Sequence, residues 1–138
     1  MRYLLDTNIL SEPMRQTPNP RVMEKLREYS SLCSTSATVW HELLFGCVRL
    51  PSSRRRHDLE DYLKQLQRSQ LPILPYDRVA ARRHAELRAE MQSQGHGCGQ
   101  ADGEIAAVAM VHQLVLVTNN IRHFEMIPGL ILENWFTG

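Results

Sequence analysis

The chain has 138 residues, of which 43% are hydrophobic and 22% are charged, and its 16 basic and 15 acidic residues leave a formal net charge of +1. This length suits one domain with one core, and the composition excludes intrinsic disorder and low-complexity repeats. The near-neutral charge excludes an overall basic field, so contact with RNA or DNA would need a local patch. We therefore expect a single domain over residues 1–138.

The spacing of the cysteines and the length of the apolar runs indicate the cellular compartment of the protein. Cys33, Cys47 and Cys98 form no Cys-x-x-Cys pair, which argues against a disulfide framework and a four-cysteine zinc site. The first apolar run stops at Asp6, so it is shorter than the core of a signal peptide. No apolar run approaches the ~20 residues that cross a bilayer. These features predict a cytoplasmic protein with no membrane partner.

Apolar spacing and turn residues predict strands that alternate with helices along the chain. Three helix starts carry capping residues: Asn19 before Pro20, Ser36 and Asp77. The expected elements are a strand over 3–5 ending in a polar turn, a helix over 20–30, a strand over 32–35, helices over 37–46 and 54–68, an edge or short strand within 71–75, a helix over 78–91, a helix with Asp102 in an early turn and its apolar residues at 105–111, and a strand over 114–117. This alternation predicts an α/β fold with a parallel sheet and helices on both faces.

Four polar side chains are placed to meet at one edge of that sheet. Asp6 and Asn120 follow predicted strands, and Glu42 and Asp102 lie in early turns of predicted helices. In an open α/β sheet the functional crevice lies outside the carboxyl ends of the strands. We therefore expect these four residues to converge there, although they come from distant parts of the chain.

The three acids of this group sit in apolar sequence, where an isolated buried carboxylate is costly. Carboxylates gathered around a cation keep their charge, and oxygen ligands suit Mg²⁺ or Mn²⁺ better than zinc. The chemistry natural to such an ion is phosphodiester hydrolysis, in which it helps to activate water and offsets charge on the phosphate. The pattern thus favours a metal-dependent hydrolase.

Each acid also has a simpler interpretation when taken alone. Asp6 is equally consistent with a turn former after a strand, and Glu42 with the solvated face of a helix. Asp102 is consistent with a favourable charge at a helix N-terminus, and Glu104 with a surface or supporting group. Only their joint placement favours a metal site.

Five segments resemble PIN-domain proteins of the VapC toxin type, and they occur in the family's order nearly from end to end. They are LLDTNILSEP at 4–13, ELLFG at 42–46, ADGEIAA at 101–107, VTNNIRHF at 117–124 and NW at 134–135. The resemblance implies an endoribonuclease of a type II toxin–antitoxin pair with a three-layer α/β/α sandwich. It also implies an acidic Mg²⁺ or Mn²⁺ site.

The resemblance assigns residues to that site one by one. It implies that Asp6, Glu42 and Asp102 are metal ligands and that Asn120 is the fourth catalytic position, where the commonest family pattern has an aspartate. The implied reaction is in-line attack of activated water on an RNA phosphodiester, which leaves a 5′-phosphate and a 3′-hydroxyl. The implied substrate is transfer or ribosomal RNA.

The implied partners are a second copy of the chain and a cognate antitoxin whose disordered tail folds onto the toxin. An antitoxin arginine would pair with the carboxylates and displace metal or substrate. Three methionines, Met14, Met23 and Met126, would line a groove for this partner or pack in the core.

Other polar residues near the four positions have two interpretations each. Thr7, Asn8 and Thr118 either orient the metal ligands or form turns and caps. His41 and His123 fit ordinary surface histidines better than RNA contacts. The basic run Arg54 to Arg56 either grips phosphates or begins a solvated helix.

Two other functions remain open from the residues alone. A phosphohydrolase with Asp6 as nucleophile would want an aspartate two residues on, where Asn8 stands, and a downstream lysine, whereas the chain has only Lys25 and Lys64. A catalytically idle binding module would use the same acids to hold a structural ion.

Overall fold

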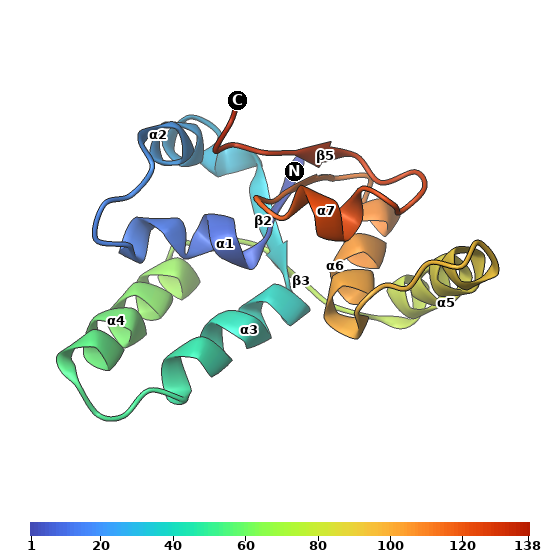
Figure 1. Cartoon of the computed structure of the whole chain (residues 1–138). Helices are drawn as coiled ribbons and strands as arrows, with labels where there is room; N and C mark the ends of the chain where they lie inside the picture. The colour runs from blue at the N-terminus through green and yellow to red at the C-terminus, as the bar shows by residue number, and fades with distance from the viewer.

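The computed structural model describes all residues 1–138, and at its centre lies a five-stranded sheet whose neighbouring strands are all parallel (Figure 1). The strand order is β3-β2-β1-β4-β5. The strands are β1 (Tyr3–Leu5), β2 (Cys33–Ser36), β3 (Ile73–Leu74), β4 (Val115–Val117) and β5 (Leu132–Glu133). The predicted parallel sheet is confirmed, and so is the edge position of the short strand within residues 71–75.

Helices cover both faces of this sheet and complete three layers. They are α1 (Thr7–Leu10), α2 (Pro20–Glu28), α3 (Ala37–Val48), α4 (Arg54–Arg68), α5 (Arg78–Ser93), α6 (Gln100–Val111) and α7 (Ile121–Phe124), with single 3₁₀ turns at Glu12–Met14 and Ser30–Leu32. Figure 1 shows α1 to α4 on one side of the strands and α5 and α6 on the other. The α/β/α architecture expected from the sequence is therefore confirmed.

Three helices begin at the residues that the sequence indicates. The Asn19 side chain accepts from the backbone N–H groups of Arg21 and Val22 at 2.9 and 3.2 Å. Ser36 caps α3 and Asp77 caps α5 in the same way, each through the third residue of its helix. These side chains satisfy N–H groups that no helical carbonyl reaches, which fixes where each helix starts.

The chain after β1 differs from the prediction. Instead of a polar turn, residues 7–10 form the helix α1, and Asp6 is its N-cap, accepting from the Thr7 backbone N–H. The elements α7 and β5 were not predicted either. Both are very short, so their apolar residues show no repeat that a sequence pattern can reveal.

The order of the strands creates a switch point between β1 and β4. The chain leaves β1 toward β2 and β3, and it crosses back to β4 and β5 only after α6. The connections on the two halves therefore lie on opposite faces, and they part at the carboxyl ends of β1 and β4. Asp6 stands at this point, since its backbone N–H donates to the Val117 carbonyl at 3.0 Å.

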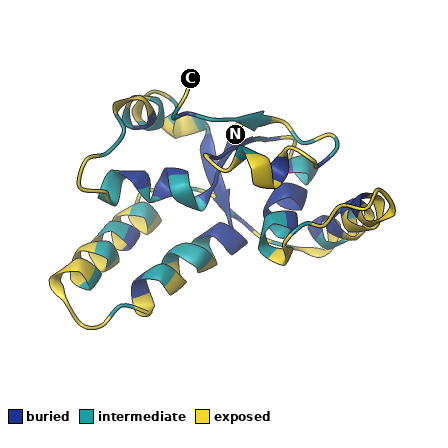
Figure 2. Cartoon of the chain, viewed as in Figure 1, coloured by how far each residue is buried: buried dark blue, intermediate teal, exposed yellow.

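The core fixes the elements that meet at the switch point. Figure 2 shows β1, β2 and much of α6 buried, β5 half-buried, and the outer faces of α4 and α5 exposed. Five residues of α6 between 105 and 109 are at most 1% exposed, as expected for a helix packed under a sheet. No helix combines the length and the apolar composition that crossing a bilayer requires.

Candidate functional site

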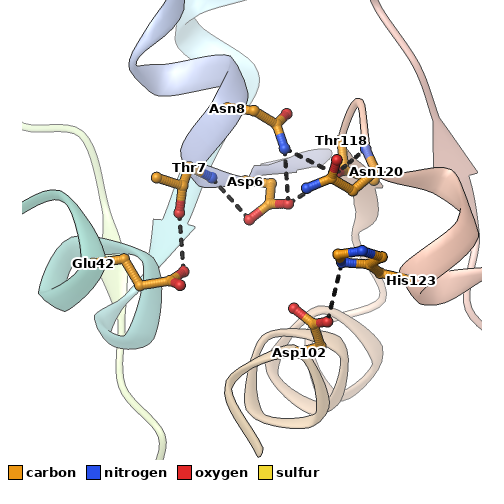
Figure 3. Close-up of polar contacts among 8 residues, drawn as sticks. All are labelled: Asp6, Thr7, Asn8, Glu42, Asp102, Thr118, Asn120 and His123. Atoms are coloured by element: carbon orange, nitrogen blue, oxygen red, sulfur yellow. Dashed lines mark hydrogen bonds and ion pairs between the residues drawn. The ribbon is translucent and has the colours of Figure 1, made fainter. Parts of the chain in front are cut away.

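Asp6 is the central acid of the site, and the chain holds its carboxylate in one orientation. It is 5% exposed. Its Oδ1 accepts from the Thr7 backbone N–H at 2.8 Å, and its Oδ2 accepts from Thr118 Oγ1 at 2.7 Å and from Asn8 Nδ2 at 3.3 Å (Figure 3). These donors compensate part of the cost of burying a polar group.

The Thr118 hydroxyl ties the end of β4 to the end of β1. While it donates to Asp6, it accepts from Asn8 Nδ2 at 3.3 Å and from the Asn120 backbone N–H at 3.0 Å. Asn8 also reaches across, because its Oδ1 accepts from the Asn119 backbone N–H at 2.9 Å. The two strand ends are thus held in a fixed register by side chains from α1 and from the turn after β4.

Thr7 connects Asp6 with the second acid, Glu42. Its backbone N–H donates to Asp6, and its hydroxyl donates to Glu42 Oε1 at 3.0 Å. Glu42 lies in the second turn of α3, and its Oε2 has no hydrogen-bond partner in the protein. One residue therefore orients two carboxylates that are 36 positions apart in the sequence.

The third acid, Asp102, comes from the first turn of α6 and faces α7. Its Oδ2 lies 3.5 Å from His123 Nδ1, and its Oδ1 has no protein partner. Both side chains are open to solvent, with 31% of Asp102 and 59% of His123 exposed. Figure 3 shows this pair on the opposite side of Asp6 from Asn8, with Glu42 to one side.

The three carboxylates repel one another across this edge. Burial raises the pKa of Glu42, and the charges of Asp6 and Asp102 raise it further, while the hydrogen bond from Thr7 opposes the shift. Burial also raises the pKa of Asp102, and so does Asp6, against the opposing effect of His123. Three acids that affect each other in this way make a region of negative potential that attracts cations.

The donor set at this edge fits a hard divalent cation. With the side chains as they stand, no three histidine, cysteine, aspartate or glutamate residues form a group that could hold a metal ion. Asp6, Glu42 and Asp102 nevertheless each keep acceptor capacity that the protein does not use, and all three are oxygen donors. A cation among them would offset both the burial and the repulsion that raise the pKa values of Glu42 and Asp102.

Asn120, the predicted fourth position, lies at the same edge. It is the residue before α7, it is exposed, and its side-chain amide makes no hydrogen bond to the protein. In Figure 3 it lies with Thr118 on one side of Asp6, with Thr7 and Glu42 on the other. The structure thus brings all four predicted positions, together with Thr7, Asn8 and Thr118, to one end of the sheet.

One neighbour of the site, His123, was not assigned to it from the sequence, and the roles of other residues were left open. His123 is exposed, as expected of a surface histidine, but its ring also faces Asp102. Its spacing of three residues from Asn120 would have indicated this had α7 been predicted. His41 is exposed, as expected. Within the basic run, Arg56 donates to the Leu50 carbonyl at 2.9 Å, so part of this run has a structural role.

The chain is similar to known proteins over nearly its whole length. Residues 3–129 match the PIN domain family. The chain is 34% identical to Ribonuclease VapC2 of Haemophilus influenzae and 34% identical to the tRNA(fMet)-specific endonuclease VapC of Salmonella typhimurium, and each match covers 98% of both chains. The crystal structure of DNA-bound VapBC from Salmonella typhimurium includes a chain that superposes with a TM-score of 0.84 at 31% identity, covering 98% of each chain.

Proposed function

Since the chain belongs to the PIN-domain family and to its VapC ribonucleases, we propose that the acidic edge hydrolyses RNA phosphodiesters with Mg²⁺ or Mn²⁺ as cofactor. The observation that carries the proposal is the convergence of Asp6, Glu42 and Asp102 at the switch point of the sheet, where their charges affect one another. Ligands of open α/β sheets bind in this crevice.

Asp6, Glu42 and Asp102 would hold the ion, and Asn120 would offer a neutral amide oxygen beside it. When bound, such an ion offsets charge on a phosphate and lowers the pKa of an attacking water. Thr7, Asn8 and Thr118 keep the Asp6 carboxylate in place, so Asp6 would be the fixed central ligand, with the half-buried side chains of Glu42 and Asp102 completing the site.

The substrate that we propose is structured RNA, either transfer or ribosomal, cleaved by in-line attack to leave a 5′-phosphate and a 3′-hydroxyl. The relative from Salmonella typhimurium is named as specific for tRNA(fMet). Arg54 and Arg55 are exposed at the start of α4 and are free to contact phosphates of such a substrate, whereas Arg56 is partly used within the chain.

The variant Asp6→Asn tests this function directly. It keeps the shape of the side chain but removes the central charge, so we expect RNA cleavage to fall at least about 100-fold. The measurement is the rate of fragment formation from transfer and ribosomal RNA in Mg²⁺ and in Mn²⁺, with circular dichroism to show that the fold is kept.

Asp77→Asn is the matched control for this experiment. Asp77 caps α5, and asparagine is an equally good cap, so this variant should cleave like the wild type. An Asp6→Asn variant that cleaves as fast as the wild type contradicts the assignment. A wild-type protein that cleaves no RNA but still binds its partner protein would point to the idle binding module instead.

We also propose where the two protein partners bind. A pocket of about 830 Å³ opens between α2 and α4, and its apolar wall includes Leu10, Met23 and Leu66. An apolar segment of an antitoxin fits this pocket. Helix α1 lies between this pocket and the acids. Leu10, at the end of α1, lines the pocket, and Thr7, at its start, donates to Glu42. An arginine beyond that segment would then pair with the carboxylates. Of the three methionines considered, only Met23 lines the pocket.

A second copy of the chain suits a different surface, the outer face of α3. Leu44, Phe45 and Val48 are 38%, 57% and 56% exposed there and follow one another along the helix. Large apolar side chains grouped on a surface typically mark an interface. We propose that two copies pair through this face, which lies apart from the pocket between α2 and α4.

One experiment separates the two partner surfaces. We expect Met23→Asp to lose co-purification with the antitoxin while keeping the mass of a dimer, and Phe45→Asp to keep the antitoxin while halving the mass. The measurement is light scattering after size exclusion of the co-expressed proteins. Each variant is the control for the other, and a Met23→Asp protein that retains the antitoxin, or a Phe45→Asp protein that remains a dimer, contradicts the corresponding surface.

A further inference from the structure

Helices α3 and α6, which carry two of the three acids, share a single side-chain hydrogen bond. Thr38 Oγ1 donates to Glu104 Oε1 at 2.7 Å. Thr38 precedes Glu42 by four residues on α3, and Glu104 follows Asp102 by two residues on α6. This bond therefore joins the two helices within one turn of each acid.

Both oxygens of the Glu104 carboxylate accept a hydrogen bond from the protein. Its second oxygen, Oε2, accepts from Gln100 Nε2 at 3.0 Å on the same helix. No lysine, arginine or histidine lies within ion-pair distance of it, so neutral donors alone hold it. Thr38 is 9% exposed, which shields the bond from competition by water.

The first turn of α6 is also held from its other side. Gly103 lies against the ring of His84 from α5, so closely that a Cβ at Gly103 would stand 2.3 Å from His84 Nε2. The His84 ring is itself fixed, because its Nδ1 lies 2.7 Å from the Tyr76 hydroxyl. The turn that carries Asp102 is thus clamped between α5 and α3.

We propose that Thr38 and Glu104 are positioning residues that set the separation between the carboxylates of Glu42 and Asp102. This inference rests on the proposed metal-dependent function. Glu104, which the sequence left as a surface or supporting group, thus has a defined supporting role. It acts through Thr38 and α3, and it does not touch the ion. Partners of metal ligands typically change metal affinity or activity by about 10- to 100-fold when removed.

Two pairs of variants test this role. Thr38→Val removes the hydroxyl with little change in shape, while Thr38→Ser keeps a hydroxyl. Glu104→Met removes the acceptor, while Glu104→Gln keeps a carbonyl oxygen for Thr38, so the comparison within this pair is free of any charge effect. The measurements are Mn²⁺ affinity by electron paramagnetic resonance and RNA cleavage as a function of Mn²⁺ concentration.

We expect Thr38→Val and Glu104→Met to weaken Mn²⁺ binding about 10-fold or more, and their cleavage to recover at high Mn²⁺. Thr38→Ser and Glu104→Gln should stay within about threefold of the wild type, given the hydrogen bond that they keep. The double variant Thr38→Val, Glu104→Met should be no weaker than either single one, since both remove the same contact.

Ser34→Ala is the control for a general loss of stability. It removes a buried hydroxyl whose 2.8 Å bond reaches the Tyr3 carbonyl inside the sheet, away from α6. The positioning role is overturned if Thr38→Val binds Mn²⁺ like the wild type, if Ser34→Ala weakens binding equally, or if the two substitutions add. If Thr38→Val does not fold, the Mn²⁺ affinities of Glu104→Met and Glu104→Gln are compared instead, and equal affinities overturn the positioning role. A wild-type protein that binds no Mn²⁺ contradicts the proposed function and the positioning role together.

Discussion

Thr7 illustrates how one residue serves both the fold and the site. Its backbone N–H starts α1 against Asp6, and its hydroxyl bonds Glu42. The sequence predicted that Thr7 would lie beside the acids, but not that it would join two of them. That contact depends on how closely α3 approaches α1, and no local pattern in the sequence contains this distance.

The raised pKa of Glu42 predicts that the site destabilises the fold when no cation is bound. A carboxyl whose pKa is higher in the folded protein than in the unfolded chain favours folding most below its unfolded pKa, and this contribution is lost as the pH rises through the folded pKa. Glu42→Gln removes the charge but keeps an oxygen for the Thr7 hydroxyl. We therefore expect this variant to be more stable than the wild type at pH 7, by less than about 1 kcal/mol because the group is partly exposed to solvent.

The measurement is urea unfolding of both proteins in a chelator, at pH 7 and at pH 4. The advantage of Glu42→Gln should shrink at pH 4, where the wild-type carboxyl is itself protonated. The same variant should lose RNA cleavage, so that stability rises as activity falls. A Glu42→Gln protein that is less stable than the wild type at pH 7 would contradict the raised pKa of Glu42, which burial and the charges of Asp6 and Asp102 cause.

At the scale of elements, the long helices and the core strands followed from their patterns, because caps and apolar spacing are local. Asn19, Ser36 and Asp77 begin their helices as predicted. The elements α1, α7 and β5 have four, four and two residues, which is too few for a periodic signal. Their stability comes from contacts with distant segments, such as the bond from the Thr118 backbone N–H to the Glu133 carbonyl.

The packing of α5 on α6 makes a sharp prediction for Gly103. A Cβ there would overlap the His84 ring, so we expect Gly103→Ala to destabilise the fold by about 1–3 kcal/mol. The measurement is chemical denaturation. His84→Ala should relieve the overlap, so the double variant should cost less than the sum of the two single substitutions.

Gly46→Ala is the matched control, because a Cβ at Gly46 meets nothing within 4 Å and the residue lies within α3. We expect Gly46→Ala to stabilise the folded protein by about 0.5–1 kcal/mol, because alanine favours a helix interior over glycine. If Gly103→Ala is as stable as Gly46→Ala, the close contact between the His84 ring and Gly103 is not a feature of the folded protein.

For the whole molecule, the sequence was enough to group Asp6, Glu42 and Asp102, because the carboxyl ends of parallel strands share one edge. It was not enough to find His123 beside Asp102, or the bond between Thr38 and Glu104. Those contacts depend on how α6 packs against α7 and against α3, and other elements separate each of these pairs in the chain. Their geometry is set by the packing of both layers on the sheet.

Anomalous diffraction from crystals of the wild-type protein soaked with Mn²⁺ tests the proposed metal site most directly. We expect an anomalous peak about 2.1 Å from an oxygen of Asp6 and from at least one oxygen of Glu42 or Asp102. The proposed metal site is contradicted if a protein that cleaves RNA in Mn²⁺ shows its anomalous peak only at other carboxylates and Asp6 does not coordinate the ion.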